Sequence, residues 1–398
     1  MAARENTGGG WIRFSDRVRA LPPYLFIEID RAKRAARARG ADIIDFGVGD
    51  PDTPTPPFVI KAFNSAVRDP RNHKYPLDFG HRDFRLAAAR WYSARFGVKL
   101  DPDREILPLI GSKEGLTHMP LAFINPGDRV LVPDPAYPAY RSGVLFAGGV
   151  PVTLPLHEKN GFLPDWKEVE KGNLSGVRMM YLNYPNNPTS AVANAAFFKR
   201  TVEFAQARRI IVCHDNAYSE IYEGRKKPTS FLAVEGAREV GVEFHSLSKT
   251  FNMTGWRLGF VCGNARLIEG LAKIKSNVDS GVFSAIQLAG AAAIGHSAAF
   301  TRKMNGLYDR RRKLLVTGLR KLSFKVFAPT ATFYVWTRLP GGGSDSMGFS
   351  KHLLERAGIV ATPGDGFGSL GKGYVRFTLT VPEPRIREAL ERMKKVAR

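Results

Sequence analysis

The chain has 398 residues, of which 44% are hydrophobic and 24% charged, which excludes a disordered protein and predicts two or three domains of roughly 150 residues each. No apolar run approaches the roughly 20 residues that span a bilayer, and residues 1–11 lack the apolar stretch of a secretion signal. Two cysteines are too few for a disulfide framework. We therefore expect a cytoplasmic protein. The net charge of +22 comes from dispersed basic residues without a basic arm or zinc knuckle, and therefore indicates a solvated surface or weak attraction to anions rather than a specific nucleic-acid site.

A helix is expected first, over residues 24–39. Apolar, β-rich runs then predict strands, and amphipathic stretches of helical length, such as 194–208, separate several of them. These strands are expected at residues 106–110, 129–132, 178–182, 210–214, 242–247 and 258–262. The alternation of strands and helices predicts an α/β domain with helices on both faces of its sheet.

The C-terminal third has a different pattern. A long helix is predicted at 298–322, followed by short strands and two further helices. The strands are expected at 324–327, 332–337 and 374–379, and the helices at 346–357 and 383–396. We therefore expect a large domain over residues 51–296 and a smaller α+β domain over 297–398, on which residues 1–50 pack.

Residues 366–371 spell the glycine pattern of a dinucleotide-binding turn, GFGSLG. That turn must open a helix, because the pyrophosphate binds the helix N-terminus. A strand is predicted to follow here instead, so a simple turn is favoured. The eight histidines include no pair at ligand spacing, and no metal site is predicted.

Four polar motifs follow predicted strands, at the sheet edge where open α/β proteins usually bind ligands. Each alone has an ordinary explanation as a helix cap or a rigid loop. A lysine directly after a buried strand, preceded by serines, is harder to explain as surface decoration. The motifs are Gly111–Gly115, Asn183–Ser190, Asp215–Tyr218 and Ser246–Arg257.

Together these motifs resemble the fold-type I pyridoxal-phosphate enzymes, specifically the class I and II aminotransferases, from about residue 22 to the C-terminus. The resemblance implies a mostly parallel sheet and pyridoxal 5′-phosphate as cofactor. Lys249 corresponds to the Schiff-base lysine, which also moves the proton between Cα and the cofactor. Asp215 corresponds to the residue that keeps the pyridine nitrogen protonated. Tyr218 and Asn187 correspond to the partners of the ring's 3-oxygen.

The resemblance also implies a cup for the cofactor's phosphate. Its members are Ser112, Lys113 (through its backbone N–H), Ser246 and Arg257, of which the arginine can bind in a bidentate manner. Tyr137 takes the position of the aromatic residue that stacks on the ring. Tyr75 takes the position of a tyrosine that reaches the phosphate of the neighbouring subunit, which implies a homodimer with shared active sites.

Arg376 matches the residue that binds the substrate's α-carboxylate in this family, with Asn187 as a second contact. Several segments, among them 46–52 and 275–283, are most similar to LL-diaminopimelate aminotransferases, which transfer an amino group from LL-2,6-diaminopimelate to 2-oxoglutarate in lysine and cell-wall biosynthesis. The further substrate-binding residues that this implies are Tyr24, Gly49, Lys113 and Asp78. Asp78 is either the partner of the distal ammonium or a solvated turn residue. Ser190 stands where relatives more often have glycine, and the loop 75–80 lacks a glutamate that relatives have.

Alternatives remain open at this stage. Another class I aminotransferase could act on alanine, aspartate, aromatic amino acids or N-succinyl-diaminopimelate, since a few side chains decide specificity. A C–S β-lyase is a weaker alternative. The charge of +22 also permits a nucleic-acid-binding regulator on the same fold, although such a protein would have no use for Lys249, Asp215, Arg257 and Arg376 together.

Overall fold

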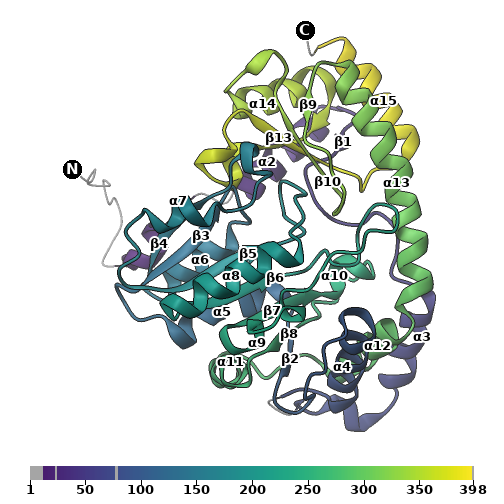
Figure 1. Cartoon of the computed structure of the whole chain (residues 1–398). Helices are drawn as coiled ribbons and strands as arrows, with labels where there is room; N and C mark the ends of the chain where they lie inside the picture. The colour runs from purple at the N-terminus through teal and green to yellow at the C-terminus, as the bar shows by residue number, and fades with distance from the viewer. Residues whose placement is uncertain (1–11, 23–24, 77–78, 397–398) are drawn as a thin grey trace.

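The computed structural model describes residues 12–22, 25–76 and 79–396. Residues 1–11, Tyr24 and Asp78 therefore lie outside the described residues, and the expectations that concern them are not tested. Figure 1 shows a large part built around one sheet and a smaller C-terminal part, with the long helix α13 (Ser297–Lys321) running along both. Within the described part of the chain, none of the helices combines the length and apolar character that a membrane crossing requires.

The large part is built on a seven-stranded sheet with the order β2-β8-β7-β6-β5-β3-β4. Every neighbouring pair from β4 to β7 is parallel, and β8 is antiparallel to both of its neighbours. The strands are β2 (Ile106–Leu109), β3 (Arg129–Asp134), β4 (Val150–Pro155), β5 (Val177–Asn183), β6 (Ile211–Asp215), β7 (Gly241–Ser246) and β8 (Gly259–Gly263). This confirms the predicted mostly parallel α/β sheet and six of its strands.

Strand β4 was not predicted from the sequence. Its segment, Val-Pro-Val-Thr-Leu-Pro, contains two prolines, and proline lacks the N–H that a central strand needs. The structure places β4 at the edge of the sheet, where one side of the strand needs no partner.

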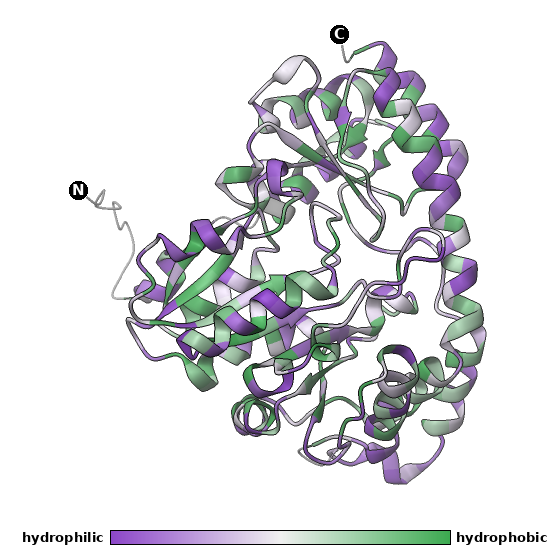
Figure 2. Ribbon diagram, viewed as in Figure 1, coloured by the Kyte–Doolittle hydropathy of each residue, from purple (hydrophilic) through white to green (hydrophobic). Residues whose placement is uncertain are grey.

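Helices cover both faces of this sheet, because successive residues of each strand point to opposite sides. One face packs Leu131, Met180 and Val212 against α4, α8 and α12, whereas the other packs Val130, Met179 and Cys213 against α5, α6 and α11. In Figure 2 these strands are largely green, as expected for a sheet buried on both faces. The helices of this part are α3 (Pro57–Ala66), α4 (Arg82–Phe96), α5 (Ser112–Phe123), α6 (Ala139–Phe146), α7 (Trp166–Glu170), α8 (Ala195–Arg208), α9 (Ala237–Val240), α10 (Leu247–Thr250), α11 (Ala265–Val278) and α12 (Ser284–Gly295).

The C-terminal part contains a four-stranded antiparallel sheet with the order β12-β13-β10-β9. Its apolar core is separate from the cores on the two faces of the large sheet, and it includes residues of α13 and α15. Figure 2 shows hydrophilic residues along much of α13 and α15. The elements are β9 (Lys325–Val326), β10 (Tyr334–Arg338), α14 (Ser346–Ala357), β12 (Thr362–Pro363), β13 (Tyr374–Thr378) and α15 (Glu383–Lys394).

The N-terminal segment joins this C-terminal part. Helix α2 (Leu25–Ala38) contacts α14, and β1 (Ile44–Asp45) pairs in parallel with β11 (Ile359–Val360). A short helix, α1 (Asp16–Arg19), precedes them. The exact domain limits at residues 50 and 296 stay a prediction. The glycine motif at 366–371 forms two 3-10 turns and leads into β13, which confirms that it does not open a helix.

Candidate active site

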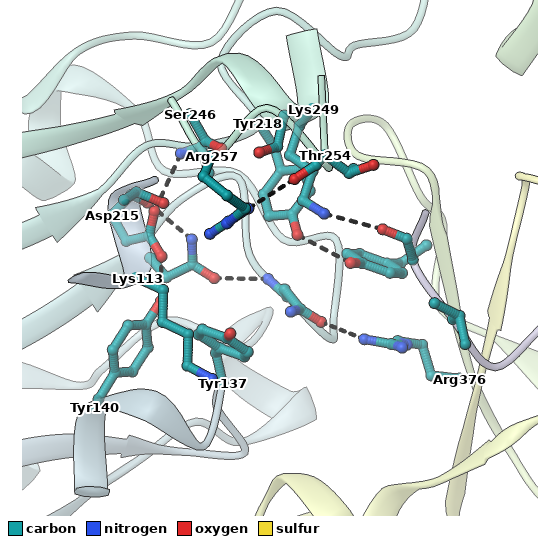
Figure 3. Close-up of a pocket in the computed structure, with 18 residues that line it drawn as sticks. Lys113, Tyr137, Tyr140, Asp215, Tyr218, Ser246, Lys249, Thr254, Arg257 and Arg376 are labelled. Carbon is teal, nitrogen blue, oxygen red and sulfur yellow. Dashed lines mark hydrogen bonds between the residues drawn. The ribbon is translucent and has the colours of Figure 1, made fainter. Parts of the chain in front are cut away.

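The four motifs meet at one edge of the large sheet. Strands β2, β5, β6 and β7 all run toward this edge, because β7 is parallel to β6 and β5, while β2 and β7 are both antiparallel to β8. The residues after these strands and Arg257, two residues before β8, are therefore brought together. They line a single cavity of about 360 Å³, into which Lys249, Asp215 and Arg257 point, while Arg376 comes from the C-terminal sheet (Figure 3).

The cavity favours anionic ligands. Its lining contains the cationic side chains of Lys113, Lys249, Arg257 and Arg376, against the one carboxylate of Asp215. Cations in a partly dehydrated site attract carboxylate and phosphate groups more strongly than they would in water. The remaining lining residues are Val48, Gly49, Ser112, Tyr137, Tyr140, Asn183, Asn187, Ala217, Tyr218, Ser246, Ser248, Thr254 and Tyr334.

Lys249 lies in α10, the single helical turn that follows β7. Its Nζ donates a hydrogen bond of 3.0 Å to the carbonyl oxygen of Gly49. Burial, together with the charges of Arg376 and Arg257, lowers the pKa of Lys249 from 10.5 to about 8, against the opposing effects of Asp50 and Asp215. About one-tenth of this amine is therefore uncharged at pH 7, far more than for an ordinary lysine, and a nucleophile or general base must be uncharged.

Asp215 ends strand β6 and is 5% exposed. Its Oδ2 accepts a hydrogen bond of 2.7 Å from the hydroxyl of Tyr140, and its Oδ1 accepts one of 3.2 Å from the N–H of Ala217. Burial raises the pKa of Asp215, and the hydrogen bond from Tyr140 opposes that rise. A cation beside this carboxylate would stabilise its ionised form, and a protonated pyridine nitrogen is such a cation.

The part of the cavity that Ser112 and Arg257 line suits a phosphate. Helix α5 begins there at Ser112, so its N-terminus can bind an anion. Arg257, which lies two residues before β8, also lines this part of the cavity. The hydroxyl of Ser248 is buried, lines the cavity and has no hydrogen-bond partner among the described residues. A Cβ atom at Gly111, where φ is +72°, would lie 2.3 Å from Nη2 of Arg257. Any other residue at this position would therefore displace the guanidinium. These residues fit a phosphorylated cofactor.

Arg376 lies on β13 and is 1% exposed. Its Nη1 donates a hydrogen bond of 2.8 Å to Oδ1 of Asn187, and its Nη2 donates one of 2.7 Å to the carbonyl oxygen of Gly47. The rings of Tyr334 and Phe367 lie 4.2 and 4.7 Å from its guanidinium carbon. The guanidinium is thus held in one orientation at the wall of the cavity.

Ser190 adopts a left-handed backbone conformation, with φ of +62°. This conformation explains why glycine suits the position, because side chains are rarely accommodated there. The serine hydroxyl hydrogen-bonds to Oγ1 of Thr332 and to the carbonyl oxygen of Tyr334, both at 2.8 Å. The departure noted in the sequence therefore adds contacts to the C-terminal sheet and removes no group from the cavity.

Most of the residues selected from the sequence line this cavity, Gly49 and Tyr218 among them. The hydroxyl of Tyr218 forms a hydrogen bond of 2.9 Å with the hydroxyl of Tyr334. Tyr75 does not line it and is 85% exposed in the single chain. Tyr24 and Asp78 lie outside the described residues. Seven cavity residues were given no site role from the sequence: Val48, Tyr140, Asn183, Ala217, Ser248, Thr254 and Tyr334.

A cluster of charged side chains lies outside the cavity, between α11 and the first turn of α5. Lys275 Nζ contacts both Glu114 (3.0 Å) and Asp279 (2.8 Å), and it is 3% exposed. Glu114, His118 and Asp279 are close enough to one another to share a metal ion, but the lysine already binds both carboxylates. We therefore assign this cluster to the attachment of α11 to α5.

The chain resembles known aminotransferases along most of its length. A model of the family "Aminotransferase class I and II" matches residues 41–393. An LL-diaminopimelate aminotransferase from Aquifex aeolicus (strain VF5) is 51% identical over 96% of this chain and 98% of its own length. Among solved structures, substrate-bound BacF from Bacillus subtilis superposes with a TM-score of 0.94, is 36% identical, and covers 97% of this chain and 98% of its own. A probable N-succinyldiaminopimelate aminotransferase from Thermus thermophilus has a TM-score of 0.88 and 38% identity, and covers 94% of this chain and 100% of its own.

Proposed function

Since the chain belongs to the class I and II aminotransferase family, we propose that it uses pyridoxal 5′-phosphate to transfer an amino group from LL-2,6-diaminopimelate to 2-oxoglutarate. The observation that carries the proposal is the placement of Lys249, Asp215 and Arg376 around one cavity in a chain 51% identical to an LL-diaminopimelate aminotransferase. The proposed enzyme is a cytoplasmic homodimer.

The cofactor would be held at both ends and on one face. Its phosphate would bind Ser112, Ser246 and Arg257 with the backbone N–H of Lys113, its ring nitrogen would face Asp215, and Tyr137 would stack on the ring. When bound, it supplies an aldehyde that condenses with amines and a cationic ring that withdraws electrons from the substrate's Cα. Tyr218 and Asn187 would donate hydrogen bonds to the ring's 3-oxygen.

The chain's own residues perform the remaining work. Lys249 Nζ would remove the proton from the substrate's Cα and then deliver it to the cofactor's C4′ carbon, acting first as a base and then as an acid. Arg376 and Asn187 bind the α-carboxylate and fix the Cα–H bond toward that amine. The oxo acid then leaves before the second substrate binds, so ping-pong kinetics are expected.

The pKa of Lys249 predicts a pH dependence of cofactor uptake. A group with a pKa of about 8 is about one-tenth uncharged at pH 7, and only the uncharged amine attacks an aldehyde. The rate constant for pyridoxal phosphate incorporation into the cofactor-free protein should therefore rise with pH and level off above about pH 8. Stopped-flow absorbance from pH 6 to pH 10 (roughly the range in which such amines titrate) measures it, and a rise that continues to the pKa of an ordinary lysine would contradict the assignment.

Tyr140 is expected to support catalysis through Asp215. Burial raises the pKa of Tyr140, so its hydroxyl stays protonated and donates to the carboxylate. Tyr140→Phe should lower kcat about tenfold, because a hydrogen bond of this kind contributes about 1–2 kcal/mol and its loss makes Asp215 less acidic. Tyr181→Phe is the matched control: its ring stacks on Tyr140 at 4.9 Å, but its hydroxyl bonds to Leu116 instead. Steady-state kinetics decide, and equal effects of the two variants would refute the role.

The distal end of the substrate carries a second amino and carboxylate group. We propose that the side chain of Lys113 binds the distal carboxylate and that Tyr24 and Asp78 complete this end, while Gly49 contacts the substrate beside Lys249. Tyr75 would reach the phosphate in the neighbouring subunit, which agrees with its exposure in the single chain.

A panel of amino donors tests the proposed substrate. Purified, cofactor-loaded protein is incubated with 2-oxoglutarate and each donor, and glutamate formation is measured. LL-diaminopimelate should give the highest kcat/KM, above N-succinyl-diaminopimelate, alanine, aspartate and phenylalanine. No turnover of LL-diaminopimelate alongside good turnover of another donor would reject the proposed substrate while retaining the aminotransferase.

A further inference from the structure

We propose that Asp134 is a positioning residue for the substrate-binding arginine. Its carboxylate holds the loop of residues 364–371 against the end of β3, and the loop in turn fixes the ring of Phe367 on the guanidinium of Arg376. The inference rests on the proposed role of Arg376 in carboxylate binding. It gives a function to the glycine-rich motif, which leads into β13 and does not open an α-helix.

The contacts between Asp134 and the loop use both carboxylate oxygens. Oδ2 accepts hydrogen bonds from the N–H of Ser369 at 3.0 Å and from its hydroxyl at 2.8 Å, and Oδ1 accepts one from the N–H of Leu370 at 3.0 Å. A fourth bond runs in the opposite sense, because the N–H of Ala136 donates to the carbonyl oxygen of Phe367 at 2.7 Å. Hydrogen bonds to an ionised acceptor are stronger than neutral ones, so one side chain closes this junction between the two sheets.

The approach of the loop depends on Gly368. Its φ of 132° and ψ of 174° belong to a region that only glycine adopts readily. A Cβ atom at this position would lie 2.2 Å from Oδ1 of Asp134. The glycine thus lets the backbone come close enough for Ser369 and Leu370 to donate to the carboxylate.

The loop connects directly to the substrate end of the cavity. It continues from β12, in which Thr362 pairs with Arg376 of β13, and Phe367 is 4% exposed with its ring 4.7 Å from the guanidinium carbon of Arg376. An aromatic ring in this position attracts the cation and excludes water from it, and a dehydrated guanidinium binds a carboxylate more strongly. Releasing the loop should therefore weaken substrate binding more than the chemical step.

The test compares cofactor-loaded Asp134→Asn, Ser369→Ala and Asp365→Asn with the wild type. Asparagine keeps the shape of Asp134 but places an NH₂ donor against N–H donors, whereas Asp365 is an exposed carboxylate of the same loop and serves as the matched control. For each variant we would measure kcat and KM with the donor that the wild type uses best, and the hydrogen–deuterium exchange of residues 364–371.

Asp134→Asn is expected to raise KM about tenfold or more, to change kcat less than about threefold, and to speed exchange of the loop amides. Ser369→Ala should act in the same direction by about two- to threefold, and it carries the test if the Asp134 variant fails to fold. Asp365→Asn should change neither KM nor the exchange of the loop amides. Faster exchange with unchanged KM, or a higher KM with unchanged exchange, would overturn the proposal.

The donor panel and this test can fail separately. If the wild type prefers a donor other than LL-diaminopimelate, the proposed substrate fails and KM for the preferred donor still reports on Asp134. If it transaminates no donor, the proposed function fails, and the calorimetric Kd of 2-oxoglutarate replaces KM. The same tenfold weakening would then support the role of Asp134, and an unchanged Kd would reject it.

Discussion

Replacing Lys249 with alanine is expected to lower kcat by at least about 10³-fold and to remove the visible absorbance of the bound cofactor. General acid–base catalysis alone contributes about 10²–10⁴-fold, and the same amine is the proposed attachment point of the cofactor. The side chain is surrounded by cavity residues, and among the described residues its hydrogen-bond acceptor is the carbonyl of Gly49, so its loss deletes the reacting group with little effect on the fold. Kinetics and the absorption spectrum of the purified variant measure both effects.

Two further variants separate charge from chemistry at this position. Lys249→Arg keeps the positive charge, but a guanidinium does not give up its proton near neutral pH, so this variant should be as inactive as the alanine variant. Lys273→Ala, an exposed lysine of α11, is the control for lysine removal and should behave as the wild type. Retention of turnover or of the absorbance band by Lys249→Ala would refute the assignment of this residue.

Replacing Arg376 with lysine is expected to lower kcat/KM by roughly 10²–10³-fold, because removing one partner of a buried charged contact costs about 2–5 kcal/mol. A lysine has a single donor centre and cannot bind a carboxylate and Asn187 with the same fork. The loss should fall on both the amino donor and the oxo acid, since both carry the α-carboxylate. Steady-state kinetics with each substrate varied in turn measure it.

The control for this variant is Arg338→Lys. Arg338 lies on the neighbouring strand β10 and also stacks on an aromatic ring, that of Tyr374, but its partner is Glu158 and it does not line the cavity. Its replacement should leave kcat/KM within about threefold, as for most half-exposed surface pairs. Cofactor absorbance should be unchanged in both variants. A similar loss in the two would mean that Arg376 acts through stability and not through carboxylate binding.

Much of the large sheet could be predicted from the sequence, because its strands are continuous apolar runs and parallel strands buried on both faces have that composition. Edge strand β4 could not, since its two prolines break the pattern. The short pairings of β1 with β11 and of β12 with β13 also lack a signal, because two residues carry no periodicity.

Some of the cavity residues could likewise be predicted from the sequence, and others could not. Lys249, Asp215, Arg257 and Ser112 stand at strand ends, and topology brings strand ends together. Tyr140 was missed although it stands three residues after Tyr137, a spacing that places both side chains on one side of a helical turn. Tyr334 gave no local signal, because only the docking of the C-terminal sheet brings its hydroxyl to Tyr218.

Reductive trapping of the cofactor tests the central claim most directly. Borohydride reduction of the cofactor-loaded protein fixes pyridoxal phosphate to the amine that holds it, and mass spectrometry of the digested protein identifies the modified lysine. We predict that the label is found on Lys249, with none on Lys113 or Lys275. A label on another lysine, or no label on protein that shows the cofactor's absorbance, would contradict the account.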